Sequence, residues 1–251
     1  MAINSKKQNR KSFLMSKIYL FRHAQASIES VNYDVLSPKG ELQATELGKY
    51  LSKKKIVFDK IYTGDLRRQQ HTAELVSKEY EKSGIGIPNP KILKNLNEHQ
   101  ATDAMKSVFP KMMLNDPYLK KLQDEIKDNP DSKHSNMMLG FKYFLHKWVK
   151  NEIIVEGIIP WKEFRVNSTN ALSTIINQTK KSEIIGVFSS GGTISSMVSE
   201  VLKLNNEIGV ADLNFSVRNT SFSSLLYSDN EVNLLSFNEL PHLDGDMITF
   251  V

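Results

Sequence analysis

Residues 17–25 read Lys17-Ile-Tyr-Leu-Phe-Arg-His-Ala-Gln25 (KIYLFRHAQ), an apolar run that ends directly at an arginine and a histidine. The run at 18–21 is apolar on both faces, which predicts a short, fully buried strand. In α/β proteins the loops that follow such strands carry the chemistry. Arg22 and His23 would supply hydrogen-bond donors and a tunable nucleophile to an anion there. The alternative is a strand-end pair that faces water, and the rest of the chain has to decide between the two.

Length and composition limit the class of protein. The chain has 251 residues, of which 40% are hydrophobic and 24% charged, which suits one large soluble α/β domain or two small ones. It contains no cysteine, so a disulfide framework, a thiolate metal site and a cysteine nucleophile are excluded. This composition fits a reducing compartment, and we expect a cytoplasmic protein.

Basic residues gather at the N-terminus. Segment 1–17 holds five Lys and Arg residues and no acidic residue, while the whole chain carries a net charge of +5. We predict a disordered basic tail over 1–16, with Met15 as an alternative start to Met1. The tail lacks the apolar core of a signal peptide, and no later stretch is long and apolar enough to span a bilayer. Because this charge lies outside the predicted fold, nucleic acid is the partner ranked last.

Strand and helix patterns alternate along the first hundred residues. Ser37 can cap a helix that Pro38 begins. Strands are predicted at 58–64 and 90–98, on either side of a helix at 65–84. This alternation predicts an α/β fold, a three-layer α/β/α sandwich around a mostly parallel sheet.

Residues 100–165 break this rhythm, because they are rich in Met, Lys, Asn and aromatic residues. We predict an inserted helical lid of two or three helices within a single domain over 17–251. An amphipathic helix at 161–179 then returns the chain to the body of that domain.

The last third of the chain supplies a Gly-rich turn and a hairpin. Residues 182–204 read as a buried strand, a Gly turn and a helix. A hairpin over 219–238, turned at Asp229-Asn230, is predicted at a sheet edge.

Four groups of polar residues follow predicted strand ends or begin predicted helices. They are Arg22-His23, Arg67-Arg68 at the start of the second helix, Glu98, and the turn SSGGTIS at 189–195. Two arginines, a helix N-terminus and a Gly-rich turn suit the binding of phosphate. A histidine suits in-line attack on phosphorus, and a carboxyl group suits protonation of the leaving group.

Four motifs occur in a fixed order before residue 100. They are RHAQ at 22–25, LSPKGELQA at 36–44, GDLRRQQHTA at 64–73 and LNE at 96–98. In this order they resemble the histidine phosphatase superfamily, which has the phosphoglycerate-mutase-like fold. The resemblance covers about residues 17–98 and 183–243 and leaves the lid unmatched. Its register makes Arg68 the phosphate-binding arginine and leaves Arg67 as a solvated helix residue.

The resemblance implies a role for each matched residue. His23 would be the nucleophile that becomes phosphohistidine, and Arg22 and Arg68 would clamp the phosphate. Glu98 would be the general acid for the leaving group and then the general base for water. Gln25 would lie near the phosphate, and neither a metal nor a cofactor is implied. For Glu98 the alternative is a strand-end carboxylate that faces water.

The chain departs from the family pattern at Ser190, where the family usually has a second histidine before Gly-Gly. That histidine normally helps to bind the phosphoryl group, and losing one such donor typically costs roughly a hundredfold in rate. Ser190 can still donate one O–H, and the turn at Gly191 can donate backbone N–H groups. We interpret His242 as structural and His99 as a loop residue that faces water. Each is also a candidate to replace the missing histidine.

The leading functional hypothesis is a metal-independent phosphoric monoester hydrolase that acts through a phosphohistidine at His23. Its substrate would be a phosphorylated small molecule or a phosphoprotein. The alternative, motivated by Ser190, is a pseudophosphatase that binds a phosphorylated ligand or protein without turnover. A phosphoglycerate mutase ranks lower, because the Trp-Asn and Gly-Trp elements of mutases are absent from 26–38. The sequence leaves the oligomeric state open.

Overall fold

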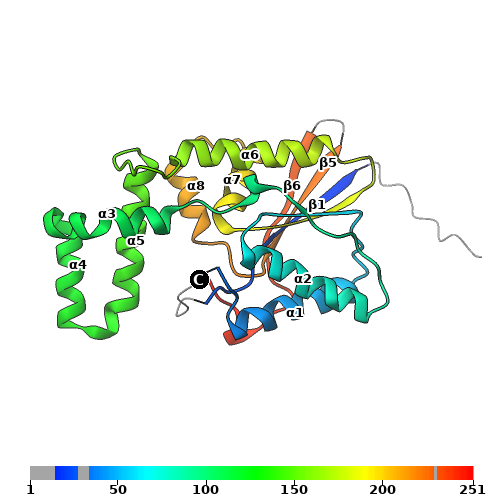
Figure 1. The fold of residues 1–251 in the computed structure, drawn as a ribbon, viewed down its shortest axis with the longest axis horizontal. Coiled ribbons are helices and arrows are strands. Elements are labelled where there is room, and N and C mark those ends of the chain that lie inside the picture. The colour runs from blue at the N-terminus through cyan, green and yellow to red at the C-terminus, as the bar shows by residue number, and fades with distance from the viewer. Residues whose placement is uncertain (1–14, 28–33, 229–230, 251) are drawn as a thin grey trace, which may run out of the picture.

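A six-stranded sheet forms the centre of the part of the chain that the computed structural model describes, residues 15–27, 34–228 and 231–250 (Figure 1). Its strands are β1 (Ser16–Arg22), β2 (Lys60–Thr63), β3 (Lys91–Ile92), β4 (Ile184–Ser189), β5 (Phe222–Ser228) and β6 (Glu231–Glu239). The strand order is β3-β2-β4-β1-β5-β6. The first four strands run parallel, whereas β5 is antiparallel to β1 and β6 is antiparallel to β5. The predicted mostly parallel α/β sheet is therefore confirmed.

Strand β1 lies inside the sheet and buries side chains on both of its faces. Ile18 and Leu20 pack into one hydrophobic cluster, and Tyr19 and Phe21 pack into the other. The helices that complete these clusters are α6 (Trp161–Asn177) and α7 (Gly191–Val201) on the first face, and α1 (Pro38–Lys53) and α2 (Arg67–Lys82) on the second. The sandwich thus has three layers, with the sheet between two helical layers (Figure 1).

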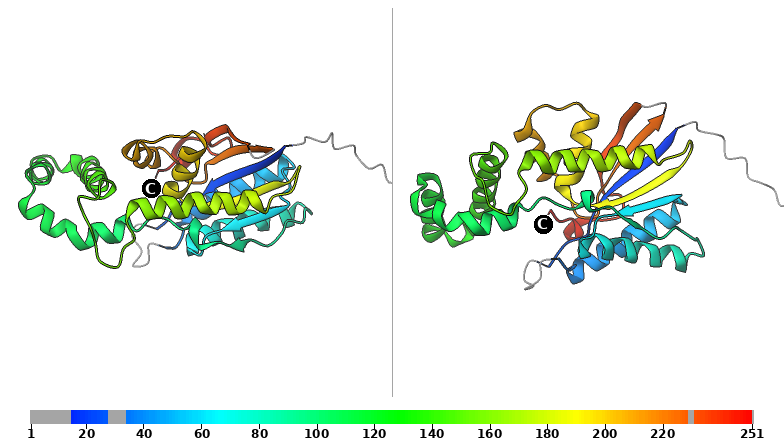
Figure 2. Two further views of the ribbon diagram at one scale, coloured as in Figure 1. Left: turned by 90° about the horizontal axis from the view of Figure 1, so that it is seen from above. Right: turned by 45° about the horizontal axis from the view of Figure 1, so that its top comes forward.

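The segment predicted as a lid contains helices α3 (Ala101–Asn115), α4 (Pro117–Asp128) and α5 (Lys133–Val149). Figure 2 shows them at one end of the molecule, beyond the edge at which the parallel strands end. Phe144 and Trp148 of α5 join the hydrophobic cluster that holds Trp161 and Phe164 of α6. The insert is therefore attached to the sandwich through a buried aromatic contact. Its role as a lid stays a prediction.

The third predicted strand is shorter than the sequence pattern indicates. In place of a strand over 90–98, a 3₁₀ turn at Lys94–Leu96 follows β3. The N–H of Leu93 still bonds to the carbonyl of Thr63 at 2.8 Å. The ladder then ends, because the chain turns to bury Leu96 in the core.

The last third of the chain contains a helix that the sequence did not predict and a hairpin that it did. Helix α8 (Glu207–Asn214) was not predicted, although Asn206 caps it by accepting the N–H of Gly209 at 3.2 Å. The hairpin of β5 and β6 lies at a sheet edge, as predicted. Its expected turn at Asp229-Asn230 and residues 1–14 of the tail expected over 1–16 lie outside the described residues. The prediction of a tail is wrong at Ser16, which is buried as the first residue of β1 and pairs with Tyr227 of β5.

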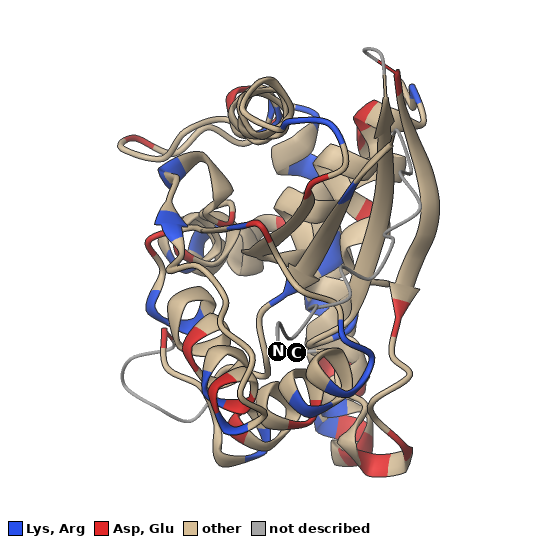
Figure 3. Ribbon diagram, turned by 90° about the vertical axis from the view of Figure 1, so that its right-hand side faces the viewer, with Lys and Arg blue, Asp and Glu red and all other residues tan. Residues whose placement is uncertain are grey.

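Acidic and basic residues are equal in number over residues 18–251. The five basic residues of segment 1–17 equal the whole net charge of +5, so the remaining residues carry as many acidic as basic groups. Figure 3 shows the two signs interspersed along the helices. None of the helices in the described ranges combines the length and apolar character that crossing a bilayer requires.

The first turn of α1 packs against the loop that follows β1. Ser37 caps the helix by accepting the N–H of Gly40 at 3.0 Å, and its hydroxyl donates to Oε1 of Gln25 at 2.9 Å. A Cβ built on Gly40 would overlap the backbone carbonyl oxygen of Gln25. The glycine in the LSPKGELQA motif is therefore required by the close approach of helix and loop.

Replacing Gly40 by alanine is expected to lower the free energy of unfolding by about 1–3 kcal/mol, because the obstructing atom belongs to the backbone and cannot rotate away. Gly140→Ala is the matched control. Gly140 lies inside helix α5, and a Cβ added there would make ordinary contacts, the nearest at 3.4 Å from the ring of Phe109. Alanine there is expected to be neutral or stabilising by up to about 1 kcal/mol. Urea denaturation of both variants checks this, and an unchanged midpoint for Gly40→Ala would contradict it.

Candidate active site

His23 follows β1 directly, at the carboxyl ends of the parallel strands. Its backbone N–H donates to the carbonyl of Ser189 at 2.8 Å, and its carbonyl accepts Nδ2 of Asn219 at 3.3 Å. The ring Nδ1 lies 2.8 Å from the carbonyl oxygen of Ala24. Because a carbonyl can only accept, Nδ1 carries the proton and Nε2 has a lone pair. Nε2 lies 3.2 Å from Nε of Arg68.

The surroundings of His23 keep its ring neutral. The residue is 3% exposed, and this burial lowers its pKa well below the ordinary value of 6.5. The positive charges of Arg68 and Arg22 lower the pKa further, while the hydrogen bond to Ala24 opposes them. Neutral imidazole is the nucleophilic form of histidine. At neutral pH the site therefore presents a lone pair beside an arginine.

The His23 ring is expected to stay neutral as the pH falls through 6.5 and to take up a proton only at more acidic pH. Since its folded pKa lies below its unfolded pKa, protonation favours the unfolded chain. His23 therefore contributes stability above about pH 6.5 that is lost as the pH falls through its folded pKa. Ring ¹⁵N NMR, with His23→Gln to identify the signal, measures both the titration and the tautomer. A His23 signal that titrates at 6.5 or higher would contradict the expectation.

Arg68 lies in the first turn of α2 and joins His23 to the loop before α1. Its Nη1 forms an ion pair with Asp34 at 2.7 Å. Asp34 also caps α2, because its Oδ2 accepts the backbone N–H of Arg67 at 2.8 Å. The side chain of Arg67 instead pairs with Glu74 and is 47% exposed, against 9% for Arg68. Arg68 thus adjoins His23, whereas Arg67 is the solvated helix residue that the sequence predicts.

Arg22 reaches from the end of β1 toward the C-terminal segment. Its Nη1 donates to the carbonyl oxygens of Val217 and Phe250, the latter at 2.6 Å. Its charge nevertheless acts on His23, whose pKa it lowers. The structure therefore places the charge of Arg22 close to His23, and its contact with phosphate stays a prediction.

Gln25 is tied to α1. Its backbone N–H donates to Oε1 of Gln43 at 2.9 Å, and its own Oε1 accepts the hydroxyl of Ser37 at 2.9 Å. These bonds fix the loop between β1 and α1 close to His23 in the chain. The expected position of Gln25 near a phosphate stays a prediction.

Glu98 is held against the start of α7. Its Oε2 accepts the N–H of Gly192 at 3.0 Å, and its Oε1 accepts the N–H of His99 at 2.9 Å. The hydroxyl of Thr193 binds the preceding segment by donating to the carbonyl of Asn97 at 2.7 Å. The Glu98 side chain is 17% exposed. The carboxylate therefore faces the helix rather than open water.

Ser190 is buried at the junction of β4 and α7. Its Oγ accepts Nε2 of Gln69 at 2.8 Å, and the same amide donates to the carbonyl of Leu96 at 3.0 Å. Because Ser190 accepts this bond, its hydroxyl can donate its own proton to a further acceptor. Sequence reasoning missed Gln69, since a glutamine in the first turn of a helix is ordinarily exposed.

Gly191, the other predicted phosphate-binding residue of this turn, packs closely against α8. A Cβ on Gly191 would overlap Oδ1 of Asn214. The glycine therefore allows α7 and α8 to approach each other. Its contact with a phosphate stays a prediction.

The prediction that His99 faces water is wrong. Its side chain is 6% exposed. Its ring lies between 5.3 and 5.8 Å, centroid to centroid, from the rings of Trp148, Trp161 and Phe164. The local sequence could not show this, because these rings belong to α5 and α6.

His242 lies behind the backbone of His23. Its Nε2 is 3.0 Å from Oγ1 of Thr220, and the N–H of Thr220 bonds to the carbonyl of His23 at 3.3 Å. The His242 ring lies 6.1 Å from the ring of Tyr50, and burial lowers its pKa to about 4. The contacts of His242 are thus those of a structural residue.

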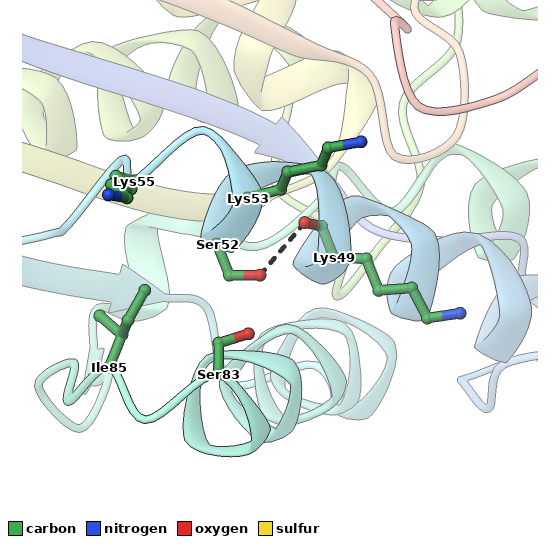
Figure 4. A pocket seen from close by; sticks show the side chains of 6 residues that line it. All are labelled: Lys49, Ser52, Lys53, Lys55, Ser83 and Ile85. Carbon is green, nitrogen blue, oxygen red and sulfur yellow. Dashed lines mark hydrogen bonds between the residues drawn. The ribbon is translucent and has the colours of Figure 1, made fainter.

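A separate hollow of about 390 Å³ lies at the opposite end of the parallel strands from His23. It is lined by Lys49, Ser52, Lys53, Lys55, Ser83 and Ile85 (Figure 4). These residues lie at the C-terminal ends of α1 and α2, where the parallel strands begin. Ligands of such sheets bind at the other edge, beyond the carboxyl ends of the strands, where His23 lies. Among the described residues, no group of three or more His, Asp or Glu side chains could hold a metal ion.

Comparison with known proteins agrees with the motifs. Residues 18–136 match the model of the histidine phosphatase superfamily (branch 1). A segment of 75 residues is 32% identical to a broad-specificity phosphatase of Saccharomyces cerevisiae. That match covers 28% of this chain and spans only a third of the length of the yeast protein.

Solved structures share the fold over nearly the whole chain. Phosphoserine phosphatase of Entamoeba histolytica superposes with a TM-score of 0.60 at 18% identity, over 91% of this chain and 100% of that one. Phosphoglycerate mutase of Bacillus anthracis gives 0.58 at 17% identity, over 91% and 95%. Alpha-ribazole phosphatase of Shigella flexneri gives 0.59 at 17% identity, over 91% and 98%. These matches show that the sandwich has the phosphoglycerate-mutase-like fold that the motifs predict.

Proposed function

We propose that this chain, a member of the histidine phosphatase superfamily, hydrolyses phosphoric monoesters through a phosphohistidine at His23. Its substrate is a phosphorylated small molecule or a phosphoprotein. The observation that carries the proposal is the state of the His23 ring. Nδ1 is bonded to the carbonyl of Ala24, and Nε2 faces Nε of Arg68. A neutral nucleophile is thus paired with a cation that can bind the phosphoryl group it attacks.

The first step forms a bond between Nε2 of His23 and phosphorus and breaks the bond from phosphorus to the ester oxygen. Glu98, protonated at the start, gives its proton to that departing oxygen. In the second step the Glu98 carboxylate takes a proton from water, and the water oxygen attacks phosphorus. The bond between nitrogen and phosphorus breaks, and its electron pair returns to Nε2. Inorganic phosphate leaves, and Glu98 is protonated again.

Charge on the transferring phosphoryl group would be stabilised from two sides. Arg68 supplies a buried guanidinium beside Nε2, and Arg22 adds a second positive charge near the ring. The N-terminus of α7 offers backbone N–H groups and positive potential, and Ser190 adds a hydroxyl there. Donors held in place before the reaction are worth most in such a site, because no reorganisation is needed when charge develops.

The test is the release of phosphate from an aryl phosphate ester between about pH 4.5 and pH 8 with EDTA present. Rapid quenching into alkali and mass spectrometry should find one phosphoryl group on the peptide that carries His23. Brief acid treatment should remove it, because phosphohistidine is labile in acid whereas phosphoserine is not. Turnover without any such adduct would rule out the phosphohistidine route.

Ser190 favours a second candidate, a pseudophosphatase that binds a phosphorylated ligand or protein without turnover. The protein would then gain thermal stability with inorganic phosphate and release none from esters. The double variant Ser190→His with Gln69→Ala distinguishes the two candidates, since removing the Gln69 amide makes room for the larger ring beside position 190. Turnover in this variant alone would identify a scaffold that is silenced in the natural sequence.

A further inference from the structure

We propose that His99 is a positioning residue for Glu98, and that it connects the general acid to the helical insert. This inference rests on the proposed function, because it assigns His99 a part in the same proton transfer. Three observations carry it: the bonds that hold residues 97–99 on α7, the burial of the His99 ring, and the approach of its Nε2 to the Glu98 carboxylate.

Residues 97–99 are fastened to the first turn of α7 by bonds from consecutive residues. Thr193 binds the carbonyl of Asn97, and Gly192 binds the carboxylate of Glu98. The His99 ring lies on the same spot, because a Cβ on Gly192 would be 2.6 Å from Cδ2 and 3.0 Å from Nε2 of His99. Glu98 and His99 thus share one face of the helix start, and only glycine leaves space for both.

The His99 ring is locked in one orientation. Aromatic rings of Trp148, Trp161 and Phe164 surround it, and its side chain is 6% exposed. Its Nδ1 lies 3.3 Å from the backbone N–H of Ala101, which donates to it. A neutral ring that accepts at Nδ1 carries its proton on Nε2.

The Nε2 edge of the His99 ring faces the acid. Nε2 lies 3.5 Å from Oε1 of Glu98, which can accept its proton. Nδ2 of Asn214 lies 3.3 Å from the same nitrogen, but it is a donor and cannot accept that proton. Oε1 also accepts the backbone N–H of His99. The backbone and the ring of one residue therefore both restrict where Oε1 can lie. His99 therefore sets the position of the Glu98 carboxyl group through its ring as well as its backbone.

The enclosure of His99 connects the acid to the insert. Trp148 belongs to α5, and the ring of Trp161 at the start of α6 is 6.0 Å from it, centroid to centroid. A shift of α5 would therefore move the His99 ring and, through it, Glu98. Interdigitated side chains in a packed core transmit such displacements.

The test uses leaving groups of different basicity. An alkyl phosphate needs a proton from the general acid as the bond breaks, whereas p-nitrophenyl phosphate leaves as a stable anion and needs it little. His99→Phe keeps an aromatic ring among the tryptophans but removes the Nε2–H. We expect it to lower kcat/KM by about 10- to 100-fold for the alkyl ester and by less than about 3-fold for the aryl ester.

His99→Gln is the conservative variant, because its side-chain amide can donate a hydrogen bond from nearly the position of Nε2. We expect it to recover most of the alkyl phosphatase activity. Glu98→Gln should show the same selective loss as His99→Phe, since both act on one proton transfer. Thermal unfolding of each variant, with and without inorganic phosphate, shows whether the fold and the phosphate site persist.

The outcomes separate the inference from the proposed function. An equal loss on both esters in His99→Phe, or no loss on either, would overturn the positioning role while leaving the phosphatase intact. If His99→Phe misfolds, His99→Leu takes its place, because it also lacks the Nε2–H and is smaller than the native ring. Selective loss on the alkyl ester in a folded His99→Leu supports the role, and an equal loss on both esters or no loss opposes it. Failure of the wild-type protein to hydrolyse either ester would overturn the proposed function, and the positioning role with it.

Discussion

His23→Ala is expected to lower kcat/KM for phosphoric monoesters by about 10,000-fold or more, the order of loss found when the nucleophile of a covalent mechanism is removed. Without Nε2 the phosphoryl group has no intermediate acceptor, so water would have to attack the ester directly. The donors around the site remain, and they account for any residual rate. Phosphate release and the alkali-stable, acid-labile adduct are measured on the same samples, and both should disappear.

The control for this variant is His134→Ala, which removes an exposed histidine from α5 of the helical insert. It should keep turnover within about twofold, because exposed substitutions rarely disturb function elsewhere. Thermal stabilisation by phosphate should survive in His23→Ala, since Arg68 and α7 are untouched. Undiminished turnover in His23→Ala would remove His23 from the mechanism.

Arg68→Met is expected to lower kcat/KM by about 100- to 1,000-fold, which corresponds to about 3–4 kcal/mol of lost transition-state stabilisation. Methionine keeps the apolar stem of the side chain but removes the donor that faces Nε2 of His23. It also leaves the Asp34 carboxylate without its 2.7 Å partner, and that negative charge would repel a phosphate. The double variant Arg68→Met with Asp34→Asn separates the two causes, and it should recover the part of the loss that is due to repulsion.

Arg67 offers a matched control one residue away. Arg67→Met removes the same charge from the same helix turn, but the side chain is half exposed and pairs with Glu74. Exposed ion pairs contribute little to stability, so the free energy of unfolding should change by less than about 1 kcal/mol. Activity should change by less than about twofold. If both variants lost activity equally, the effect would come from overall charge and not from the contact with His23.

The parts of the fold that could be predicted are those that local sequence determines. The apolar run at 18–21 fills both faces of β1, and the Ser37-Pro38 pair begins α1 where its capping chemistry indicates. The register of the family resemblance at the GDLRRQQHTA motif separated Arg68 from Arg67. Each of these features depends on residues within one helix turn or one strand of each other.

The parts that could not be predicted depend on residues far apart in the chain. The burial of His99 requires rings at 148, 161 and 164, and the contact of Gln69 with Ser190 joins residues 121 positions apart. Arg22 likewise bonds to carbonyls at 217 and 250. Helix α8 is short, and propensity alone is a weak guide for eight residues.

The pairing of β1 also constrains how the protein folds. Lys17 pairs with Ile184, and Tyr19 pairs with Gly186 on one side and Ser224 on the other. During synthesis more than 160 further residues must therefore be added before β1 can pair with another strand. Closing so long a loop costs entropy before any contact repays it, so folding should be slow for a chain of this size. Until β4 emerges, an apolar strand stays unpaired, and the nascent chain is most open to aggregation or chaperone capture in that interval.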